Sequence, residues 1–344
     1  MITIVGSGVV ALTTAEQLLA KGFPVKIITK SDGVNDSLCS WWAGGMLAPF
    51  CEMESAEPLV GELAPISMAY WQQLSAKTQN SAFSFPYHQQ GTLVVAPAQD
   101  KNQLQLFARK TTNWEKINAA QIKVLEPDVQ GFSEALFYPS EAHIEPRLVL
   151  KALWHRVSQQ AEILTNTPLS EKDIQQLCLE QDWVIDCRGY YAKESLSNLR
   201  GVRGEMLHLY HPEIHLARPV RFLHRRIPIY IVPRENQQFM VGATMIESEF
   251  RGPKRASVRA VLELLSSAYG LNPMFSQAEI VEIGADVRPA YPNNLPKVLR
   301  QNNRLFINGM HRHGYLLSPA ITKIAVDLIS EQQPHKLIEE LNNA

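Results

Sequence analysis

The sequence MITIVGSGVVA, residues 1–11, decides the fold of the protein. Ile2 to Val5 is a short apolar stretch typical of a strand, and it runs directly into a glycine turn of the form GxGxxA. Gly6 and Gly8 permit a tight turn and a close approach of backbone to a phosphate, and Ala11 lets a helix pack closely on the strand. The turn therefore predicts a dinucleotide site, with a pyrophosphate at the N-terminus of the helix.

The residues after the turn supply the context that this motif needs. Apolar side chains recur at helical spacing from Leu12 to Leu19, the helix is expected to end at Gly22, and residues 23–29 predict a second strand. Strand, glycine turn, helix and strand in this order indicate a Rossmann-type unit.

Length and composition limit the classes of protein that remain. The 344 residues suffice for one large domain or two ordinary ones, and 45% apolar with 19% charged residues is typical of a soluble globular chain. A net charge of −1 provides no general attraction for nucleic acid or an anionic membrane. No run approaches the roughly 18–20 apolar residues that span a bilayer. The apolar N-terminus lacks a basic leader, so we expect a strand there and not a signal peptide.

Cysteine usage indicates neither a metal site nor a disulfide framework. The four cysteines lie at 39, 51, 178 and 187, without a CxxC pair or a Cys/His cluster. We therefore expect a cytoplasmic location.

Strands and helices alternate along the rest of the chain. Strands are predicted at 91–95, 183–186, 230–233, 239–244 and 305–308, and helices from 100 onward and at 146–159, 256–269 and 318–329. A Rossmann sheet needs more parallel strands than the first unit provides, and 183–186 and 305–308 are the best candidates. The predicted fold is thus α/β, with a discontinuous Rossmann-type dinucleotide-binding domain (1–82, 143–204 and 285–344) and a smaller α+β domain with a mainly antiparallel sheet (83–142 and 205–284). Ligands are expected at the carboxyl ends of the parallel strands, facing the second domain.

The end of the second strand distinguishes between nicotinamide and flavin. The acid that usually binds the ribose falls about twenty residues after the glycines, but Thr29 and Lys30 stand there. Thr29 cannot clamp two hydroxyls as a carboxylate does, and we interpret Lys30 as facing solvent and not as a ligand of a 2′-phosphate. This weakens a nicotinamide interpretation, whereas for flavin it affects only the adenosine contact.

The segment CSWWAGGMLAPF, residues 39–50, allows two interpretations. Gly44 and Gly45 would let backbone lie flat against a large planar ligand. The alternative, slightly favoured for the segment alone, is a core loop anchored by its two tryptophans.

Two downstream segments carry further candidate residues. Residues 284–296 place Arg288 among turn residues, and arginine is suited to bidentate carboxylate binding, although a lone arginine is more often structural. Residues 306–320 combine a strand, a glycine turn, the sequence HRHG and a helix starting near Ser318, which indicates a second anion or flavin-edge site. His311 and His313 could bind a metal in principle, but no third ligand lies nearby in the sequence, so no metal is predicted.

Two other features have simpler interpretations. The basic run from Arg218 to Arg226 is interpreted as a solvated loop, with a gate over the pocket or a small RNA contact as alternatives. Residues 143–146 (HIEP) are interpreted as the entry to a helix, with Glu145 near its positive end.

Taken together, these segments resemble one family, the D-amino-acid oxidase and glycine oxidase group of flavoenzymes. The matching segments, spread in family order over residues 5–320, are VGSGVVA, WWAGGMLAP, HIEP, RGVRGEML, YIVPRENQQFMVGATM, DVRPAYPNNLP and NGMHRHGYLLSPA. The resemblance implies non-covalent FAD. Relatives that bind flavin covalently attach it through a cysteine near the C-terminal region, and this chain has no cysteine beyond Cys187. It also implies oxidation of glycine or another small amine with O2 to an imine, then glyoxylate and ammonia, with H2O2. The resemblance implies that the reaction needs no general base from the protein. It also implies that the protein is a homo-oligomer and that a thiazole synthase takes up the imine.

The resemblance also assigns roles to individual residues. It implies that Arg288 binds the substrate carboxylate with Tyr230 as its partner, that Met46 and Met245 line the pocket, and that Arg312 is a second active-site arginine. The implied cofactor contacts are Gly6, Gly8, Val9, Val10, Thr29, Lys30, Gly44, Gly45, Met46, Leu169, Gly189, Gly309, Arg312, His313, Gly314, Tyr315 and Leu316. Pro228, Arg188-Gly189 and the histidines 311 and 313 depart from the family pattern, which affects the expected substrate side chain more than the reaction.

Other functions stay open at this point. One is an oxidase or a dehydrogenase of sarcosine or small D-amino acids. Another is a tRNA-modification flavoprotein, which only the basic run favours and which salt-dependent tRNA binding would reveal. A third is a non-catalytic flavin-binding protein, whose flavin no amino acid would bleach.

Overall fold

The computed structural model describes residues 1–224, 227–249, 254–331 and 335–341. The N-terminal unit is the predicted one: β1 (Ile2–Val5) leads into α1 (Val9–Ala20), which returns to β2 (Val25–Ile28). β1 pairs in parallel with β2 on one side and with β10 (Trp183–Asp186) on the other. The strand at 183–186 therefore belongs to the Rossmann sheet although about 150 residues separate it from β2, a separation that a discontinuous parallel sheet allows.

In the described part of the chain this sheet has seven strands. Parallel pairs join β9 (Glu162–Leu164), β2, β1, β10 and β18 (Arg304–Asn308), and β17 (Lys297–Gln301) then pairs antiparallel with β18 and parallel with β19 (Ile338–Glu340). The predicted downstream strand at 305–308 thus lies in the same sheet, next to β10.

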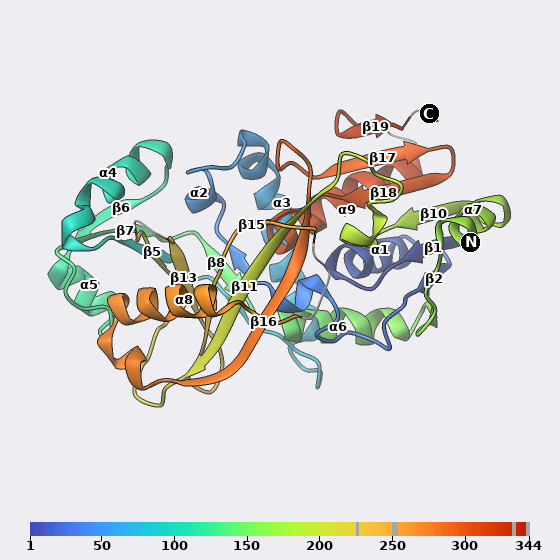
Figure 1. The fold of residues 1–344 in the computed structure, drawn as a ribbon. Coiled ribbons are helices and arrows are strands. Elements are labelled where there is room, and N and C mark those ends of the chain that lie inside the picture. Colours follow the sequence, from blue (N-terminus) through green and yellow to red (C-terminus); the bar gives the residue numbers. More distant parts are fainter. Residues whose placement is uncertain (225–226, 250–253, 332–334, 342–344) are drawn as a thin grey trace.

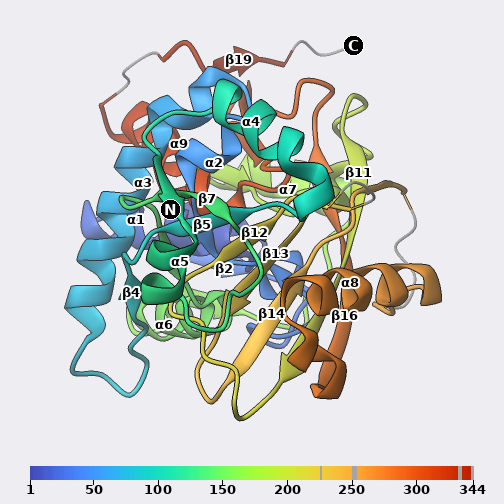
Figure 2. The ribbon, with the colours of Figure 1, turned by 90° about the vertical axis from the view of Figure 1, so that its left-hand side faces the viewer.

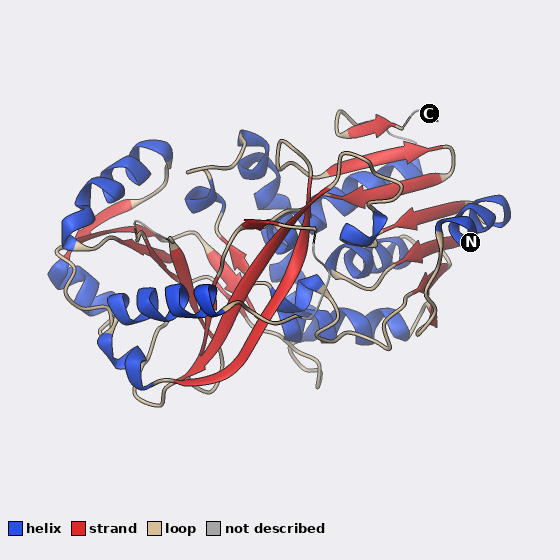
Figure 3. Cartoon of the chain, viewed as in Figure 1, coloured by secondary structure: helices blue, strands red, loops and turns tan. Residues whose placement is uncertain are grey.

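Helices cover both faces of the seven-stranded sheet, as a mostly parallel sheet requires. On one face lie α1, α3 (Pro58–Thr78), α6 (Pro146–Ser158) and α9 (Gly314–Glu331), packed around residues such as Ile4 and Leu12. On the other, Val5 and Val184 pack against Ile174 of α7 (Glu171–Glu180). Figures 1 and 3 show these helices grouped around the strands at one end of the molecule.

The second sheet is mainly antiparallel and lies at the other end of the molecule (Figure 1). Its strands, in order, are β15 (Ile246–Glu247), β11 (Arg200–Tyr210), β14 (Gln238–Gly242), β13 (Ile229–Pro233), β12 (Val220–Phe222), β5 (Thr92–Val95), β7 (Glu134–Tyr138) and β6 (Glu115–Asn118), with β16 (Glu279–Ala290) on the other edge of β11. The predicted strands at 230–233 and 239–244 are present as β13 and β14, which pair antiparallel. The short helices α4 (Lys101–Lys110) and α5 (Ala119–Leu125) and the helix α8 (Val258–Leu271) belong to this end, and Figure 2 shows them from that side.

Short elements complete the fold. A small sheet consists of β3 (Met46–Leu47), β8 (Ala142–Ile144) and β4 (Tyr87–His88), and α2 (Pro49–Glu52) follows β3 directly. Single 3-10 turns are η1 (Cys39–Trp42), η2 (Ala98–Asp100), η3 (Gly189–Ala192) and η4 (Pro273–Gln277). Among the described helices, none combines the length and apolarity that crossing a bilayer demands.

The architecture is therefore the predicted one, a Rossmann-type domain joined to a second domain with a mainly antiparallel sheet. Two long strands, β11 and β16, connect the two parts (Figure 1). Two of the predicted domain boundaries, at 204/205 and 284/285, fall inside these strands and not in a loop. The domain boundaries therefore stay predictions.

Candidate active site

A cavity of about 670 Å³ lies between the two sheets, within the size range of cofactor and ligand pockets. The Rossmann part contributes the turn after β1, the ends of β2, β10 and β18, and the loop before β3. The second sheet contributes side chains of β11, β12, β13 and β16.

The first glycine turn fits a pyrophosphate. Gly6 has φ +124°, and a Cβ there would lie 2.8 Å from the carbonyl oxygen of Cys187, so only glycine fits between β1 and β10. Gly8 caps α1 without a side chain, and Ser40 Oγ accepts a hydrogen bond from the Val9 N–H at 3.1 Å. Because a helix N-terminus with backbone N–H groups facing a cavity attracts anions, this geometry suits the phosphates of a dinucleotide.

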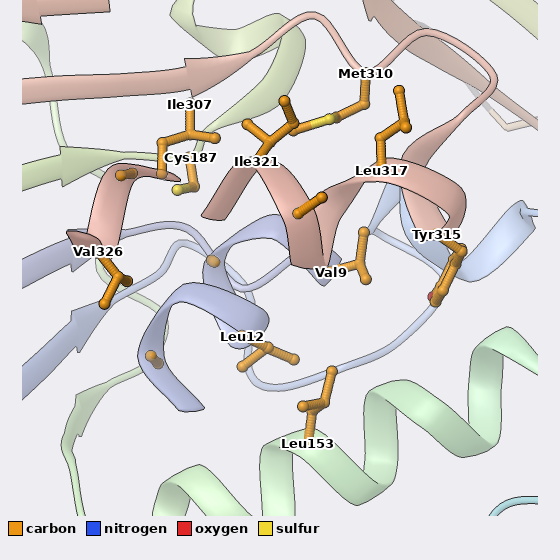
Figure 4. Packing of buried hydrophobic residues seen from close by; sticks show 14 of the residues in the cluster. Val9, Leu12, Leu153, Cys187, Ile307, Met310, Tyr315, Leu317, Ile321 and Val326 are labelled. Atoms are coloured by element: carbon orange, nitrogen blue, oxygen red, sulfur yellow. The ribbon is translucent and has the colours of Figure 1, made fainter. Parts of the chain in front are cut away.

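A second helix begins beside the first. α9 starts at Gly314, and a Cβ on Gly314 would lie 3.9 Å from Val9 Cγ1. Figure 4 shows Val9 of α1 with Tyr315 and Leu317 of α9 in one packed cluster. Both helix N-termini therefore border the same cavity, and the second one as an anion or flavin-edge site stays a prediction.

The expected helix start at Ser318 is wrong. Ser318 is buried one turn inside α9, and its hydroxyl donates a hydrogen bond to the Gly314 carbonyl. The charge-free sequence GYLL continues the helix toward the HRHG turn because these apolar side chains are buried against α1 and α3.

At the end of β2, the Thr29 hydroxyl forms its hydrogen bonds within the protein. Thr29 Oγ1 lies 2.8 Å from Ser7 Oγ and accepts a hydrogen bond from the Ser31 N–H at 3.2 Å. Lys30 is exposed, as expected, but its ammonium stands 3.1 Å from the centre of the Tyr191 ring, and both side chains border the cavity. An adenosine at this end would thus meet a cation–aromatic pair where a carboxylate is usual.

The loop before β3 is anchored in the core, as one of its two interpretations expects, and the contact of Gly44 and Gly45 with a planar ligand stays a prediction. Trp42 is buried, which anchors the loop in the core. Gly45 has φ +72°, and a Cβ on it would lie 2.1 Å from the Ile144 carbonyl oxygen. A Cβ on Gly44 would come within 2.8 Å of the Tyr230 ring, so the loop backbone packs directly against this tyrosine while it lines the cavity.

Arg288 is the distinctive side chain at the second-sheet end. It lies on β16 opposite Val202 of β11, and its guanidinium covers Gly204, where a Cβ would lie 2.1 Å from Nη2. Nη1 donates to the Thr244 carbonyl at 3.2 Å. In the described ranges, no carboxylate lies within ion-pair distance of this guanidinium, which leaves it available for an anionic group.

Neighbouring cations have carboxylate partners. Arg203 pairs with Glu205 at 3.2 Å, and Lys254 pairs with Asp286. Arg221 and Arg312 share Glu52, at 3.2 and 2.7 Å respectively.

The two histidines of HRHG are neutral at neutral pH. Burial lowers the pKa of His311 to about 3, with His313 and Arg288 adding to the effect. Burial also lowers the pKa of His313 to about 4, against the opposing attraction of Glu52. Over the residues that the structure describes, no group of three or more His, Cys, Asp or Glu side chains is arranged to hold a metal ion.

The cavity brings together residues from distant parts of the sequence. All the candidate cofactor and substrate residues border it except Gly309, whose φ is +81° and whose Cβ would meet the Tyr291 ring at 2.3 Å. The individual roles of these residues stay predictions. Sequence reasoning missed Ser40, Glu52, Arg203, Arg221 and Tyr191.

The basic run from Arg218 to Arg226 is not a solvated loop. Residues 220–222 form the buried strand β12, Arg218 pairs with Glu126 at 2.7 Å, and Arg221 is buried beside Glu52. Strand alternation around Val220, Arg221 and Phe222 was the overlooked signal, since it directs the arginine to the opposite side from its apolar neighbours. The described part of the run therefore offers no exposed basic surface to RNA; residues 225 and 226 lie outside the described residues.

Two helix N-termini and a close-packed glycine turn border one cavity, next to an antiparallel sheet that presents an arginine, an arrangement suited to a dinucleotide cofactor and a small anionic ligand. The chain belongs to the family of FAD dependent oxidoreductases, whose family model matches residues 1–328.

Individual relatives agree with this assignment. The chain is 44% identical over 338 residues to a putative thiamine biosynthesis oxidoreductase, ThiO, of Rhizobium etli, covering 97% of this chain and 98% of the relative. It is 24% identical over 349 residues to a glycine oxidase of Bacillus licheniformis, covering 95% and 92%. The crystal structure of glycine oxidase from Geobacillus kaustophilus has the same fold, with a TM-score of 0.81 at 21% identity, covering 98% of this chain and 95% of the other.

Proposed function

We propose that this protein oxidises glycine, or an amine of similar size, with O2. The products are the imine and H2O2, and water converts the imine to glyoxylate and ammonia. The observation that carries the proposal is the Arg288 guanidinium, held over Gly204 without a carboxylate partner in the described ranges, in the cavity that both helix N-termini border. FAD, when bound, supplies the two-electron oxidation.

The side chains around Arg288 bind and orient the substrate. Arg288 takes the carboxylate as a bidentate hydrogen-bond donor, and Tyr230, which packs on Gly44, lines the same cavity. Orientation of this kind can supply several kcal/mol of barrier lowering. The amine reacts in its neutral form, and the lowered pKa values of His311 and His313 make both imidazoles poor bases for accepting its proton.

The helix N-termini provide the electrostatic setting for the cofactor. That of α1 suits the pyrophosphate, and that of α9 favours negative charge at the edge of the flavin ring. Among the implied cofactor contacts, Leu169 and Gly189 border the same cavity.

Substrate size is proposed to be small. Met46 lines the cavity at the start of β3, and Met245 lines it with a side chain that is 56% exposed and whose sulfur lies 4.0 Å from Arg312 Nη1. Sarcosine and small D-amino acids remain alternative substrates, and an electron acceptor other than O2 remains an alternative to oxidase activity.

The biological setting follows from the relative's name. The similarity to a putative thiamine biosynthesis oxidoreductase supports a role in supplying the imine of glycine to a thiazole synthase. A cytoplasmic location and a homo-oligomeric assembly stay predictions of the sequence.

Anaerobic flavin bleaching tests the proposal. The purified protein should be yellow and should release all of its flavin as FAD on acid precipitation. Glycine, sarcosine and D-alanine should then reduce the bound flavin faster than D-phenylalanine. Faster reduction by D-phenylalanine would indicate a general D-amino-acid oxidase, and no reduction by any amino acid would leave a non-catalytic flavin-binding protein.

A further inference from the structure

We propose that Glu52 determines the charge specificity of this cavity: by holding Arg312 and Arg221, it restricts the enzyme to amines with a single carboxylate. This inference rests on the proposed oxidation of small amino acids. It concerns a residue of α2 that borders the cavity but lies outside the set of substrate-binding candidates.

The geometry shows one carboxylate shared by two guanidinium groups. Arg221 Nη1 donates to Glu52 Oε1 at 3.2 Å, and Arg312 Nε lies 2.7 Å from Oε2. Arg312 is held at its other end as well, since Nη2 donates to Ser55 Oγ at 2.6 Å. His313 Nδ1 stands 3.6 Å from the same Oε2.

Glu52 is ionised under all ordinary conditions. Burial by itself would raise its pKa, but the neighbouring guanidinium groups of Arg312 and Arg221 lower the pKa to about 2. The carboxylate is therefore ionised, and Glu52 borders the cavity with its Oε2 covered by neighbouring atoms.

This charge decides how many substrate carboxylates the cavity can accept. With Arg312 and Arg221 paired, Arg288 remains to bind one carboxylate. A second carboxylate on the substrate would meet Glu52 at close range and would have to displace it from its arginines, and such repulsion is an effective means of rejecting a near-cognate ligand.

Arg312 is the cation that its ion pair with Glu52 prevents from binding the substrate. Its side chain is 20% exposed, against 9% for Arg221, and it reaches Met245 at the rim of the cavity. If Glu52 loses its charge, Arg221 still has a second carboxylate partner, because its Nη2 lies 4.0 Å from Glu54 Oε2. Neutralising Glu52 should therefore free Arg312 for a second substrate carboxylate.

The experiment compares substrates that differ by one carboxylate. FAD-loaded wild type and Glu52→Gln are assayed with sarcosine and iminodiacetate, and with D-alanine and D-aspartate. For at least one pair, the kcat/KM of the dicarboxylate relative to the monocarboxylate should rise about tenfold or more in Glu52→Gln. Glu54→Gln, which removes the nearby carboxylate that pairs with Lys110 and leaves the Glu52–Arg312 ion pair in place, should leave both ratios unchanged, and Glu52→Gln/Arg312→Gln should lose the gain.

Several outcomes would overturn the inference. Unchanged ratios in Glu52→Gln with normal FAD content would do so, as would a gain that survives loss of Arg312. If Glu52→Gln and Glu52→Asn both fail to hold FAD, Glu52 serves the fold and the inference also fails. A wild type that oxidises none of the monocarboxylates would instead refute the proposed function, so the two failures are distinguishable.

Discussion

The guanidinium of Arg288 rests on the α-carbon of Gly204, so closely that a Cβ at position 204 would lie 2.1 Å from Nη2 and 2.4 Å from Cζ. The register of β11 and β16 pairs Arg288 with Val202, and Gly204 is two residues further along the same face of β11. The long side chain therefore extends along the partner strand, and the missing Cβ gives it room.

Gly204→Ala should displace Arg288 and lower kcat/KM for glycine by about tenfold to a hundredfold, because a misplacement of about 1 Å can cost that much. FAD content should stay normal. The comparison is Gly201→Ala on the same strand, where an added Cβ would crowd Ser248 and Val287 and not Arg288. Equal loss of activity in both variants would mean that strand distortion, and not Arg288, is responsible.

Arg288→Ala should lower kcat/KM for glycine by about two to three decades, since truncating one partner of a desolvated charge pair costs roughly 2–5 kcal/mol. Arg288→Lys should recover only part of the lost kcat/KM, because an ammonium group cannot bind a carboxylate in the bidentate geometry of a guanidinium. In the same variants, kcat/KM for an amine without a carboxylate should fall far less. Near-normal glycine kinetics in Arg288→Ala would make Arg288 structural, and Arg312 would become the better candidate.

Gly8→Val should abolish FAD binding in a chain that still folds. Any Cβ at this position would lie 3.2 Å from Ser40 Oγ, and the branched side chain would fill the space in front of the α1 N-terminus. Flavin content after gel filtration and circular dichroism of the same sample measure binding and folding separately. Full FAD occupancy would show that the pyrophosphate lies elsewhere.

Glu141→Gln should make the protein less sensitive to rising pH. Glu141 is fully buried, its Oε1 accepts a hydrogen bond from the Cys51 N–H at 2.7 Å, and burial raises its pKa to about 7. The folded state thus holds a proton that the unfolded chain releases near its ordinary pKa of 4.5, so this contribution to stability is lost as the pH rises from there through about 7.

Thermal unfolding at pH 5 and pH 8 checks this expectation. The Tm of the wild type should fall between these values by about 2 °C or more beyond the fall in Glu141→Gln, which has no proton to lose. The exposed Glu115→Gln should behave like the wild type. Parallel curves for Glu141→Gln and the wild type would contradict the assignment.

Local sequence determined the cofactor-binding unit. The glycine turn, the helix from Val9 and the strands at 2–5, 183–186 and 304–308 are specified by neighbouring residues, through turn geometry and hydrophobic periodicity, and the structure forms them within a few residues of the predicted bounds. The class of cofactor could therefore be predicted from short segments.

Only the tertiary structure decided the charge arrangement of the cavity. Glu52, Arg221 and Arg312 are separated by 169 and 91 positions in the chain, and no local pattern relates α2, β12 and the turn before α9. For the same reason the sequence misjudged the basic run at 218–226, since the burial of Arg221 depends on a carboxylate from another element. Ion pairs form between side chains that the packed sheets bring within a few ångströms, whereas local sequence constrains only the turns, helices and strands that carry them.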